Sequence, residues 1–418
     1  MFKCILVLFV INNYVFGSKH WGDKQKLTTV ASWKQLSYSI DGVIYSKDTD
    51  DKNVPNKSNN GTVKSEKFFI QYNNVPSGVE LDNNRVFVTV PRRQYGIPST
   101  INFILPDQSS SVLYPFPSPR YIEQFVSVYR PRIDDCGRIW FVDTGLLEIP
   151  GERKQVKKPT IYAFDLKMDK LVVKYELKDT DLVNERTPGG LTSITIDVSP
   201  NCCNDAYAYI NDLATSGMIV YSMKDNDSWR IEDPSFKYQS SAVNFTAAGY
   251  LITWQDGLFS IALSEPDDKG KRTAYYHSLV STQEFAVDTK ILKSGVRNLN
   301  GNSMLLGNRG PLTQSGSHDY HPETRILFFA NVAQDAILCW RTDTALTEDN
   351  VGIAAQDRKK LVYISDLKVI KDEVWVLVNQ MPVFIFSTLN PDEVNFYIHK
   401  ANIRDLIRGT VCDIGHDK

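Results

Sequence analysis

The sequence lacks a strong charge of either sign, and it lacks any apolar run long enough to cross a membrane. Its 418 residues carry 47 Lys and Arg against 49 Asp and Glu, a formal net charge of -2. A near-neutral chain gives no electrostatic reason to expect nucleic acid or an anionic membrane surface as a partner. A bilayer-spanning helix needs about 20 apolar residues, and the sequence contains no such stretch. We therefore expect no nucleic-acid partner and no membrane partner.

Recognisable catalytic and metal-binding motifs are also missing. The G-x-S-x-G elbow, the H-E-x-x-H zinc pair and the phosphate-binding G-x-x-x-x-G-K are absent. Of the six histidines, His318 and His321 lie close together, and a neighbouring glycine and proline favour a loop over a metal site. Ser317, His318 and Asp319 are sequence neighbours, whereas the members of a catalytic triad converge from separate parts of a chain. We expect no metal and no cofactor.

The N-terminus has the pattern of a secretory signal peptide. Lys3 supplies a positive charge, residues 5–11 form a short apolar run, and Gly17 ends a segment suited to cleavage. The apolar run is too short to span a bilayer. The sequence therefore predicts a signal peptide over residues 1–17 and a mature chain that is secreted into the extracellular space.

Cysteine usage and glycosylation patterns agree with export. Cys4 leaves with the signal peptide, so the mature chain keeps five cysteines and no C-x-x-C pair. An odd number of cysteines in a secreted protein leaves one thiol free or unusually paired. Four sequons are candidate glycan sites on surface loops: Asn56, Asn60, Asn226 and Asn244.

Two regions of different character follow the signal peptide. Residues 18–66 are polar and rich in turn-forming residues, which predicts an irregular lead-in. Residues 67–414 contain many short runs of β-branched and aromatic residues closed by turns, such as residues 86–90 and 374–378. Helical periodicity is scarce, with residues 403–407 as one short candidate.

This pattern predicts an all-β fold in a single domain. A pair of sandwiches, a large barrel and a propeller all fit many short strands in one long chain. A loose repeat favours the propeller, because an apolar strand ending in Asp or Asn is followed by a turn and a second strand with an aromatic residue. The repeat occurs at residues 140–166, 209–221 and 328–340.

Longer strings of residues resemble one known family. They include residues 87–93, the segment from Val128 to Gly145, residues 203–210 and the block from Asn395 to Asp413. In these blocks, which span roughly residues 70–414 in order, the chain resembles the insect Yellow and major royal jelly protein family. The resemblance implies a six-bladed β-propeller whose central channel can hold a small molecule.

The resemblance also implies a disulfide pattern. Many Yellow proteins carry an extra cysteine pair at positions that hold Gln124 and Lys157 here. In that respect the chain looks more like the salivary amine-binding branch of the family. The family pattern implies two bridges and leaves one thiol over: Cys136–Cys203, Cys339–Cys412 and Cys202.

A candidate ligand site follows from the salivary relatives, which bind serotonin and catecholamines through a Thr, an Asn and a Phe near the last blade. The matching positions are Ser365, Asn379 and Met381. Ser365 keeps a hydroxyl, Asn379 keeps an amide, and the Met381 thioether can contact an aromatic ligand. The alternative is that Ser365 and Asn379 only cap strands or stabilise turns.

Three functions stay open at this point. The first is a non-enzymatic binder of small aromatic amines or catechol derivatives, linked to pigmentation or amine scavenging, which needs only a preformed pocket. The second is a dopachrome-converting isomerase of melanin synthesis, which needs a general acid or base in the channel. No His or carboxylate stands out for that role, which favours binding over catalysis. The third is a structural or cuticle-associated protein without a ligand. We expect a monomer.

Overall fold

The predicted signal peptide and the sequons at Asn56 and Asn60 lie outside the part of the chain that the structure describes. None of the described helices is long and apolar enough to cross a membrane. The computed structural model describes five stretches: residues 26–50, 67–106, 111–149, 152–199 and 202–415.

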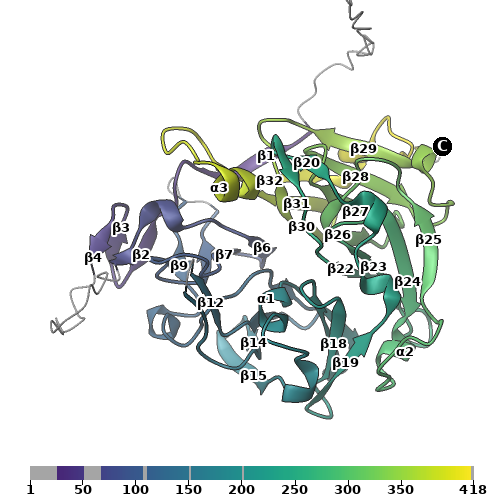
Figure 1. The fold of residues 1–418 in the computed structure, drawn as a ribbon, viewed down its shortest axis with the longest axis horizontal. Coiled ribbons are helices and arrows are strands. Elements are labelled where there is room, and N and C mark those ends of the chain that lie inside the picture. Colours follow the sequence, from purple (N-terminus) through teal and green to yellow (C-terminus); the bar gives the residue numbers. More distant parts are fainter. Residues whose placement is uncertain (1–25, 51–66, 107–110, 150–151, 200–201, 416–418) are drawn as a thin grey trace, which may run out of the picture.

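The described strands form six four-stranded antiparallel sheets, which are arranged as blades around a central axis (Figure 1). The first strand of each blade lies innermost, and each contacts the first strand of the next blade, so the six strands close a ring. This arrangement confirms the predicted six-bladed β-propeller.

The first three blades come from the N-terminal half of the chain. The first contains β6 (Gly78–Leu81), β7 (Val86–Thr89), β8 (Ile101–Ile104) and β9 (Tyr114–Pro115). The second contains β10 (Arg132–Ile133), β11 (Arg138–Asp143), β14 (Thr160–Asp165) and β15 (Lys170–Glu176). The third contains β16 (Ile194–Ser199), β17 (Cys202–Asp212), β18 (Gly217–Ser222) and β19 (Asp227–Glu232).

The other three blades complete the ring. The fourth contains β22 (Leu258–Leu263), β23 (Thr273–Ser278), β24 (Gln283–Asp288) and β25 (Met304–Asn308). The fifth contains β26 (Ser315–His321), β27 (Ile326–Asn331), β28 (Ala336–Arg341) and β29 (Val351–Gln356). The sixth contains β30 (Ile364–Ile370), β31 (Glu373–Val378), β32 (Phe396–Asn402) and, at its outer edge, β1 (Thr28–Trp33).

β1 closes the ring, because it adds a strand from the N-terminal segment to a blade built from the C-terminal one. It pairs antiparallel with β32, from Thr28 opposite Lys400 to Trp33 opposite Phe396. The predicted irregular lead-in over residues 18–66 is therefore wrong for its described part. The sequence did not indicate β1 because its composition is polar, and it is polar because an edge strand exposes part of its side chains to solvent.

The same part of the chain forms three more short strands: β2 (Tyr38–Ile40), β3 (Val43–Tyr45) and β4 (Thr49–Asp50). β4 pairs with β5 (Lys67–Phe69).

Two hairpins and several short helices connect the blade strands. The hairpins are β12 (Leu146–Ile149) with β13 (Glu152–Gln155), and β20 (Phe245–Ala247) with β21 (Tyr250–Ile252). The α-helices in the described residues are α1 (Thr187–Gly190), α2 (Thr289–Leu292), α3 (Met381–Phe386) and α4 (Ile403–Ile407). The last of these confirms the helix predicted over residues 403–407.

Apolar side chains fill the spaces between neighbouring blades. Between the second and third blades, for example, one buried cluster includes Trp140, Ile161, Ile194, Ala208 and Ile219. Such interiors are packed as densely as organic crystals. The packing therefore holds the six inner strands, and the side chains that they direct toward the axis, in fixed positions.

Two disulfide bridges confirm the implied pairing. Cys136, in the turn between β10 and β11, is bonded to Cys203 in β17 and links the second blade to the third. Cys339 in β28 is bonded to Cys412 beyond α4, which fastens the C-terminal segment to the fifth blade. Cys202 is exposed and unpaired.

The two described sequons lie on the surface. Asn226 and Asn244 are exposed, and their φ angles of 49° and 69° are in the left-handed region that Asn adopts in turns. Asn226 occupies the turn between β18 and β19. These positions are compatible with glycans, and glycosylation itself stays a prediction.

Candidate functional site

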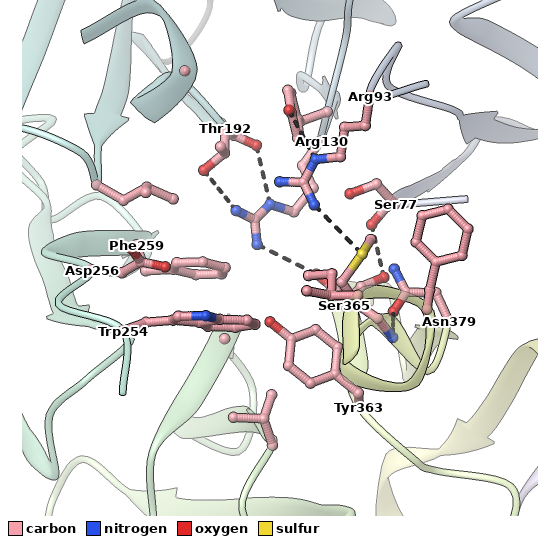
Figure 2. A pocket seen from close by; sticks show the side chains of 18 of the residues that line it. Ser77, Arg93, Arg130, Thr192, Trp254, Asp256, Phe259, Tyr363, Ser365 and Asn379 are labelled. Carbon is pink, nitrogen blue, oxygen red and sulfur yellow. Dashed lines mark hydrogen bonds between the residues drawn. The ribbon is translucent and has the colours of Figure 1, made fainter. Parts of the chain in front are cut away.

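A cavity of about 550 Å³ lies on the axis of the ring (Figure 2). Because the inner strands converge there, residues that are far apart in the sequence meet in one pocket. The volume is in the range typical of small-molecule sites. Every blade contributes a lining residue from its first strand or from the segment just before it: Ser77, Arg130, Thr192, Phe259, Gly316 and Ser365.

Aromatic side chains form part of the wall. Trp254, Phe259 and Tyr363 point into the cavity (Figure 2). The rings of Trp254 and Tyr363 meet edge to face, with their centroids 6.4 Å apart. Met381 and Phe384 of α3 add further apolar surface. Such a wall suits a flat aromatic ligand, which can pack against ring faces and edges.

Arg130 projects into the same cavity, and its guanidinium is held by neutral oxygen atoms (Figure 2). Its Nε and Nη2 donate to the carbonyl and hydroxyl of Thr192, at 3.1 and 2.8 Å. Its Nη1 donates to the carbonyl of Ser365 at 3.3 Å. The guanidinium also lies 4.1 Å from the centroid of the Phe259 ring, a cation–π contact. These contacts fix the position of a buried positive charge.

A second arginine in the wall is neutralised. Arg93 Nε lies 3.5 Å from a carboxylate oxygen of Glu148 and 3.1 Å from the hydroxyl of Tyr129. The Tyr129 hydroxyl donates to the same carboxylate. Arg93 also contacts the Met381 sulfur at 3.5 Å. The charge of Arg93 is therefore paired with that of Glu148 within the protein, whereas Arg130 has no such partner among the described residues.

Asp256 is a carboxylate in the pocket wall without a hydrogen bond or salt bridge in the described part of the chain. Burial raises the pKa of Asp256 to about 6, and the positive charges of Arg93 and Arg186 oppose that rise. Burial, together with the nearby charge of Asp256, raises the pKa of Tyr363, so its hydroxyl stays protonated at neutral pH. The pocket thus contains a proton acceptor matched to neutral pH and a phenol that can donate a hydrogen bond.

The comparison with known families accords with this propeller and its pocket. The family model described as "Major royal jelly protein" matches residues 126–412, which is more than half of the chain. The chain belongs to the major royal jelly protein family. The match runs from the second blade to the second cysteine of the C-terminal bridge.

Relatives from this family align along most of the chain. L-dopachrome tautomerase yellow-f of Drosophila melanogaster is 37% identical over 412 residues, which cover 94% of this chain and 95% of the relative. Dopaminechrome tautomerase of the same fly is 32% identical over 366 residues, which cover 82% and 78%. Protein yellow of that species is 33% identical over 403 residues, which cover 93% and 71%. The names of these relatives link the family to catechol-derived pigment chemistry.

The three residues predicted to bind an amine lie together in the pocket wall. Asn379 is fully buried; its amide donates to the Pro76 carbonyl at 2.8 Å, and its Oδ1 accepts from the Met381 amide at 3.0 Å. The hydroxyl of Ser365 donates to the Ser77 carbonyl at 2.9 Å. These are the strand and turn contacts that the sequence left open as an alternative, and a direct role in ligand binding stays a prediction.

Sequence reasoning missed the charged residues of the pocket. No carboxylate stood out in the sequence, whereas the structure places Asp256 in the cavity wall. Arg130 lies within a string that carries the family resemblance, and the string alone assigns it no role. A usable signal existed, because Trp254, Asp256 and Arg130 each stand just before the first strand of a blade. That signal becomes readable only when the blade boundaries are known.

The histidine pair interpreted as part of a loop lies in a strand. His318 and His321 both belong to the buried strand β26, and their odd spacing directs them to opposite faces. The neighbours of His318 do not form a triad with it: the Ser317 hydroxyl accepts from a backbone amide of β30 at 2.6 Å, and Asp319 pairs with Arg132 at 2.6 Å. The loop expectation was wrong because a glycine and a proline at the two ends of a strand resemble turn signals.

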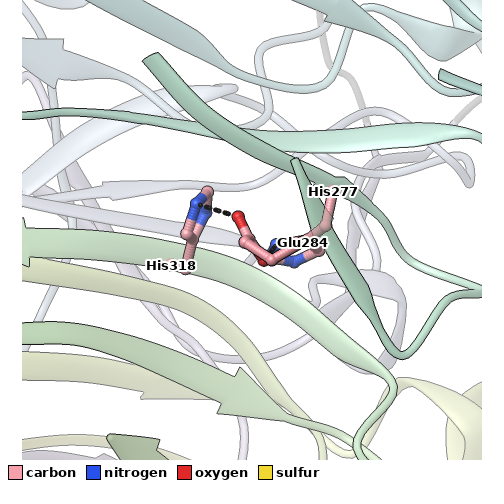
Figure 3. Close-up of side chains that lie close together, drawn as sticks. All are labelled: His277, Glu284 and His318. Atoms are coloured by element: carbon pink, nitrogen blue, oxygen red, sulfur yellow. Dashed lines mark hydrogen bonds and ion pairs between the residues drawn. The ribbon is translucent and has the colours of Figure 1, made fainter. Parts of the chain in front are cut away.

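His318 instead joins a buried cluster with His277 and Glu284 (Figure 3). The Glu284 carboxylate lies 3.0 Å from Nδ1 of His277, 3.2 Å from Nε2 of His318 and 2.6 Å from Nη1 of Arg309. Burial opposes ionisation of Glu284, yet His277 and His318 hold the pKa of its carboxyl below its usual range. These residue types can ligate metals, but Arg309 already neutralises Glu284. We therefore interpret the cluster as an ion-pair network between the fourth and fifth blades.

Proposed function

We propose that this protein is a tautomerase that acts on an aminochrome, an oxidised catecholamine with an indoline-quinone ring. Two relatives that align over 94% and 82% of the chain carry the names L-dopachrome tautomerase and dopaminechrome tautomerase. The observation that carries the proposal is Asp256, an unpartnered carboxylate with a pKa of about 6 in an aromatic pocket.

The reaction requires proton transfer and no oxidant. In an aminochrome, the five-membered ring has two saturated carbons and the six-membered ring has two quinone oxygens. Tautomerisation breaks one C–H bond at each saturated carbon and forms one O–H bond at each quinone oxygen. The two C–H electron pairs become the new ring double bond and restore the aromatic catechol ring. The product is an isomer, a dihydroxyindole, so the atoms and electrons balance.

Residues of the pocket have the chemistry for each part of this reaction. The ionised carboxylate of Asp256 accepts a proton from a saturated ring carbon, a general-base role that fits a pKa near the working pH. The phenol of Tyr363, which stays protonated, donates a hydrogen bond to a quinone oxygen as that oxygen becomes negative. Trp254 and Phe259 stack on the flat ring system.

The decisive experiment compares wild-type protein with Asp256→Asn in an assay of dopachrome decay by absorbance, after subtraction of the spontaneous rate. We expect catalysed decay by the wild type and a loss of about 100-fold or more in the variant, the usual contribution of a general base. The control is Asp268→Asn, which changes an exposed carboxylate outside the pocket. No catalysed decay by the wild type would reject the proposal, and an active Asp256→Asn variant would reject the role of Asp256.

The second candidate is a non-enzymatic binder of small aromatic amines. The same Asp256 favours it, because a lone carboxylate among aromatic rings can pair with an ammonium group. Calorimetric titration with serotonin and dopamine tests it: saturable one-to-one binding that weakens in Asp256→Asn and Asn379→Ala, without any turnover of aminochromes, would favour this function. If both assays are negative, a structural or cuticle-associated role gains support.

We also propose that the protein acts outside the cell, as a secreted and glycosylated monomer. The proposal rests on the signal-peptide pattern of residues 1–17, the two disulfide bridges and the exposed sequons. Disulfides persist in oxidising compartments and are rare in the cytosol. Expression in insect cells tests it: the protein should accumulate in the medium and elute as a monomer, and retention inside the cells would contradict it.

A further inference from the structure

Arg130 lines the pocket with part of its hydrogen-bonding capacity unused. A guanidinium has five N–H donors. All five donors of Arg92, which is also held by neutral oxygens, are taken by five backbone carbonyls. For Arg130, the hydrogen bonds account for three donors, which go to Thr192 and Ser365. Two N–H groups are thus available on a side chain that lines the pocket.

The charge of Arg130 also lacks a direct counter-charge. Among the described residues, no Asp or Glu oxygen lies within 4.0 Å of its guanidinium, whereas Arg230 and Arg309 each form a short salt bridge with a carboxylate. The charge of Asp366 does influence Arg130. The Asp366 carboxylate is nevertheless committed elsewhere, since it accepts backbone amides of Val79 and Leu367, both at 3.0 Å.

A buried, fixed and unpaired cation in a ligand pocket is costly unless an anion completes it. The planar guanidinium fork matches a carboxylate, to which it can donate two parallel hydrogen bonds. The same positive charge disfavours a ligand that carries only an ammonium group. Asp256, the unpartnered carboxylate of the pocket, lines the same cavity and forms no salt bridge with Arg130.

We propose that Arg130 binds a carboxylate of the substrate and makes the pocket selective for aminochromes that carry one over their decarboxylated counterparts. This inference rests on the proposed tautomerase function and adds the substrate class. In dopachrome the carboxylate is attached to a saturated carbon of the five-membered ring. Arg130 would thus hold the ring that must lose protons, while Asp256 receives them.

The kinetic test measures kcat/KM for dopachrome and for dopaminechrome, which lacks the carboxylate, with wild-type protein, Arg130→Gln and Arg130→Lys. We expect the wild-type kcat/KM for dopachrome to exceed that for dopaminechrome by about 10- to 100-fold, the contribution expected from a pair of charge-assisted hydrogen bonds. Arg130→Gln should lose most of that preference, because its kcat/KM for dopachrome should fall by a larger factor than its kcat/KM for dopaminechrome. Arg130→Lys, which keeps the charge without the fork, should lie between them. The control is Arg404→Gln, an exposed change far from the pocket.

A binding test separates this inference from the proposed reaction. Indoline-2-carboxylate and indoline are stable molecules that share the ring and differ in the carboxylate, and quenching of tryptophan fluorescence can report their binding. We expect the wild type to bind indoline-2-carboxylate at least about 10-fold more tightly than indoline. Arg130→Gln should bind the two molecules with equal affinity. That result without any turnover of aminochromes would reject the tautomerase and keep the carboxylate site.

Two results would overturn the inference. In the first, the wild type shows no preference for dopachrome over dopaminechrome and none for indoline-2-carboxylate over indoline. This result does not depend on whether a variant folds. Alternatively, Arg130→Gln would lower kcat/KM for both aminochromes by the same factor, which would make Arg130 a structural residue that supports the pocket through Thr192 and Ser365.

Discussion

Replacing Asp256 by Asn should stabilise the protein while it removes catalysis. Burial raises the pKa of Asp256 from 3.8 to about 6, so the folded protein disfavours the ionised carboxylate that is present at pH 7. The full shift corresponds to about 3 kcal/mol. Because the carboxylate keeps some contact with solvent, we expect Asp256→Asn to raise the free energy of unfolding at pH 7 by about 1–2 kcal/mol.

The stability difference should depend on pH in a defined direction. A raised pKa means that the folded state favours the protonated acid, so the wild type regains stability as pH falls through 6. At about pH 3, below its ordinary pKa of 3.8, Asp256 is mostly protonated in both the folded and the unfolded chain, and the advantage of the variant should vanish. Denaturant unfolding of both proteins at several values between pH 7 and pH 3 measures this difference directly.

Activity measured on the same samples completes the argument. For a base with a pKa of about 6, the ionised fraction falls from about 0.9 at pH 7 to about 0.1 at pH 5, so wild-type kcat/KM should fall about tenfold. Asp268→Asn should match the wild type in both measurements. A profile that is flat down to pH 5, or an Asp256→Asn variant less stable than the wild type at pH 7, would refute the assignment of Asp256 as a strained, catalytic carboxylate.

Other parts of the ring give simpler predictions. Glu284→Gln leaves the charge of Arg309 buried without a carboxylate partner. The free energy of unfolding should therefore fall by about 3–5 kcal/mol, which thermal unfolding can measure. An unchanged melting temperature would contradict the ion-pair interpretation. The double change Cys339→Ser and Cys412→Ser should lower the free energy of unfolding by about 2–4 kcal/mol, and reduction of the wild type, which breaks both bridges, should lower it by at least as much. Asn226→Gln should remove the mass of one glycan from secreted protein, and an identical glycan mass in both proteins would show that this exposed sequon is unused.

The blade strands were predictable from the sequence because their side chains are buried on both faces. The run at residues 86–90 matches β7, and the run at residues 374–378 matches β31, each within one residue at either end. Buried strands of this kind read as continuous β-branched and aromatic runs. β1 was not predictable, because it alternates exposed and buried residues and its partner β32 lies at the opposite end of the chain.

The pocket was predictable only where a family pattern named its residues. The resemblance led to Ser365, Asn379 and Met381, which do share one wall of the cavity. It could not lead to Arg130 or Asp256, because their importance depends on what they do not contact. An unpaired charge is a property of three-dimensional surroundings, and no local spacing in the sequence reports it.

Backbone strain is found beside the same wall of the pocket. Tyr363 and Gln380 have φ angles of 56° and 52°, and Tyr363 is the only aromatic residue with positive φ in the described chain. A bulky residue in this region costs about 1–2 kcal/mol. The two backbones are held by hydrogen bonds, from the Asn379 amide to the Tyr363 carbonyl at 3.4 Å and from the Gln380 amide to the Val362 carbonyl at 3.3 Å. The fold keeps a phenol in the cavity at the expense of a relaxed backbone, which is the arrangement expected where a conformation serves ligand chemistry more than stability.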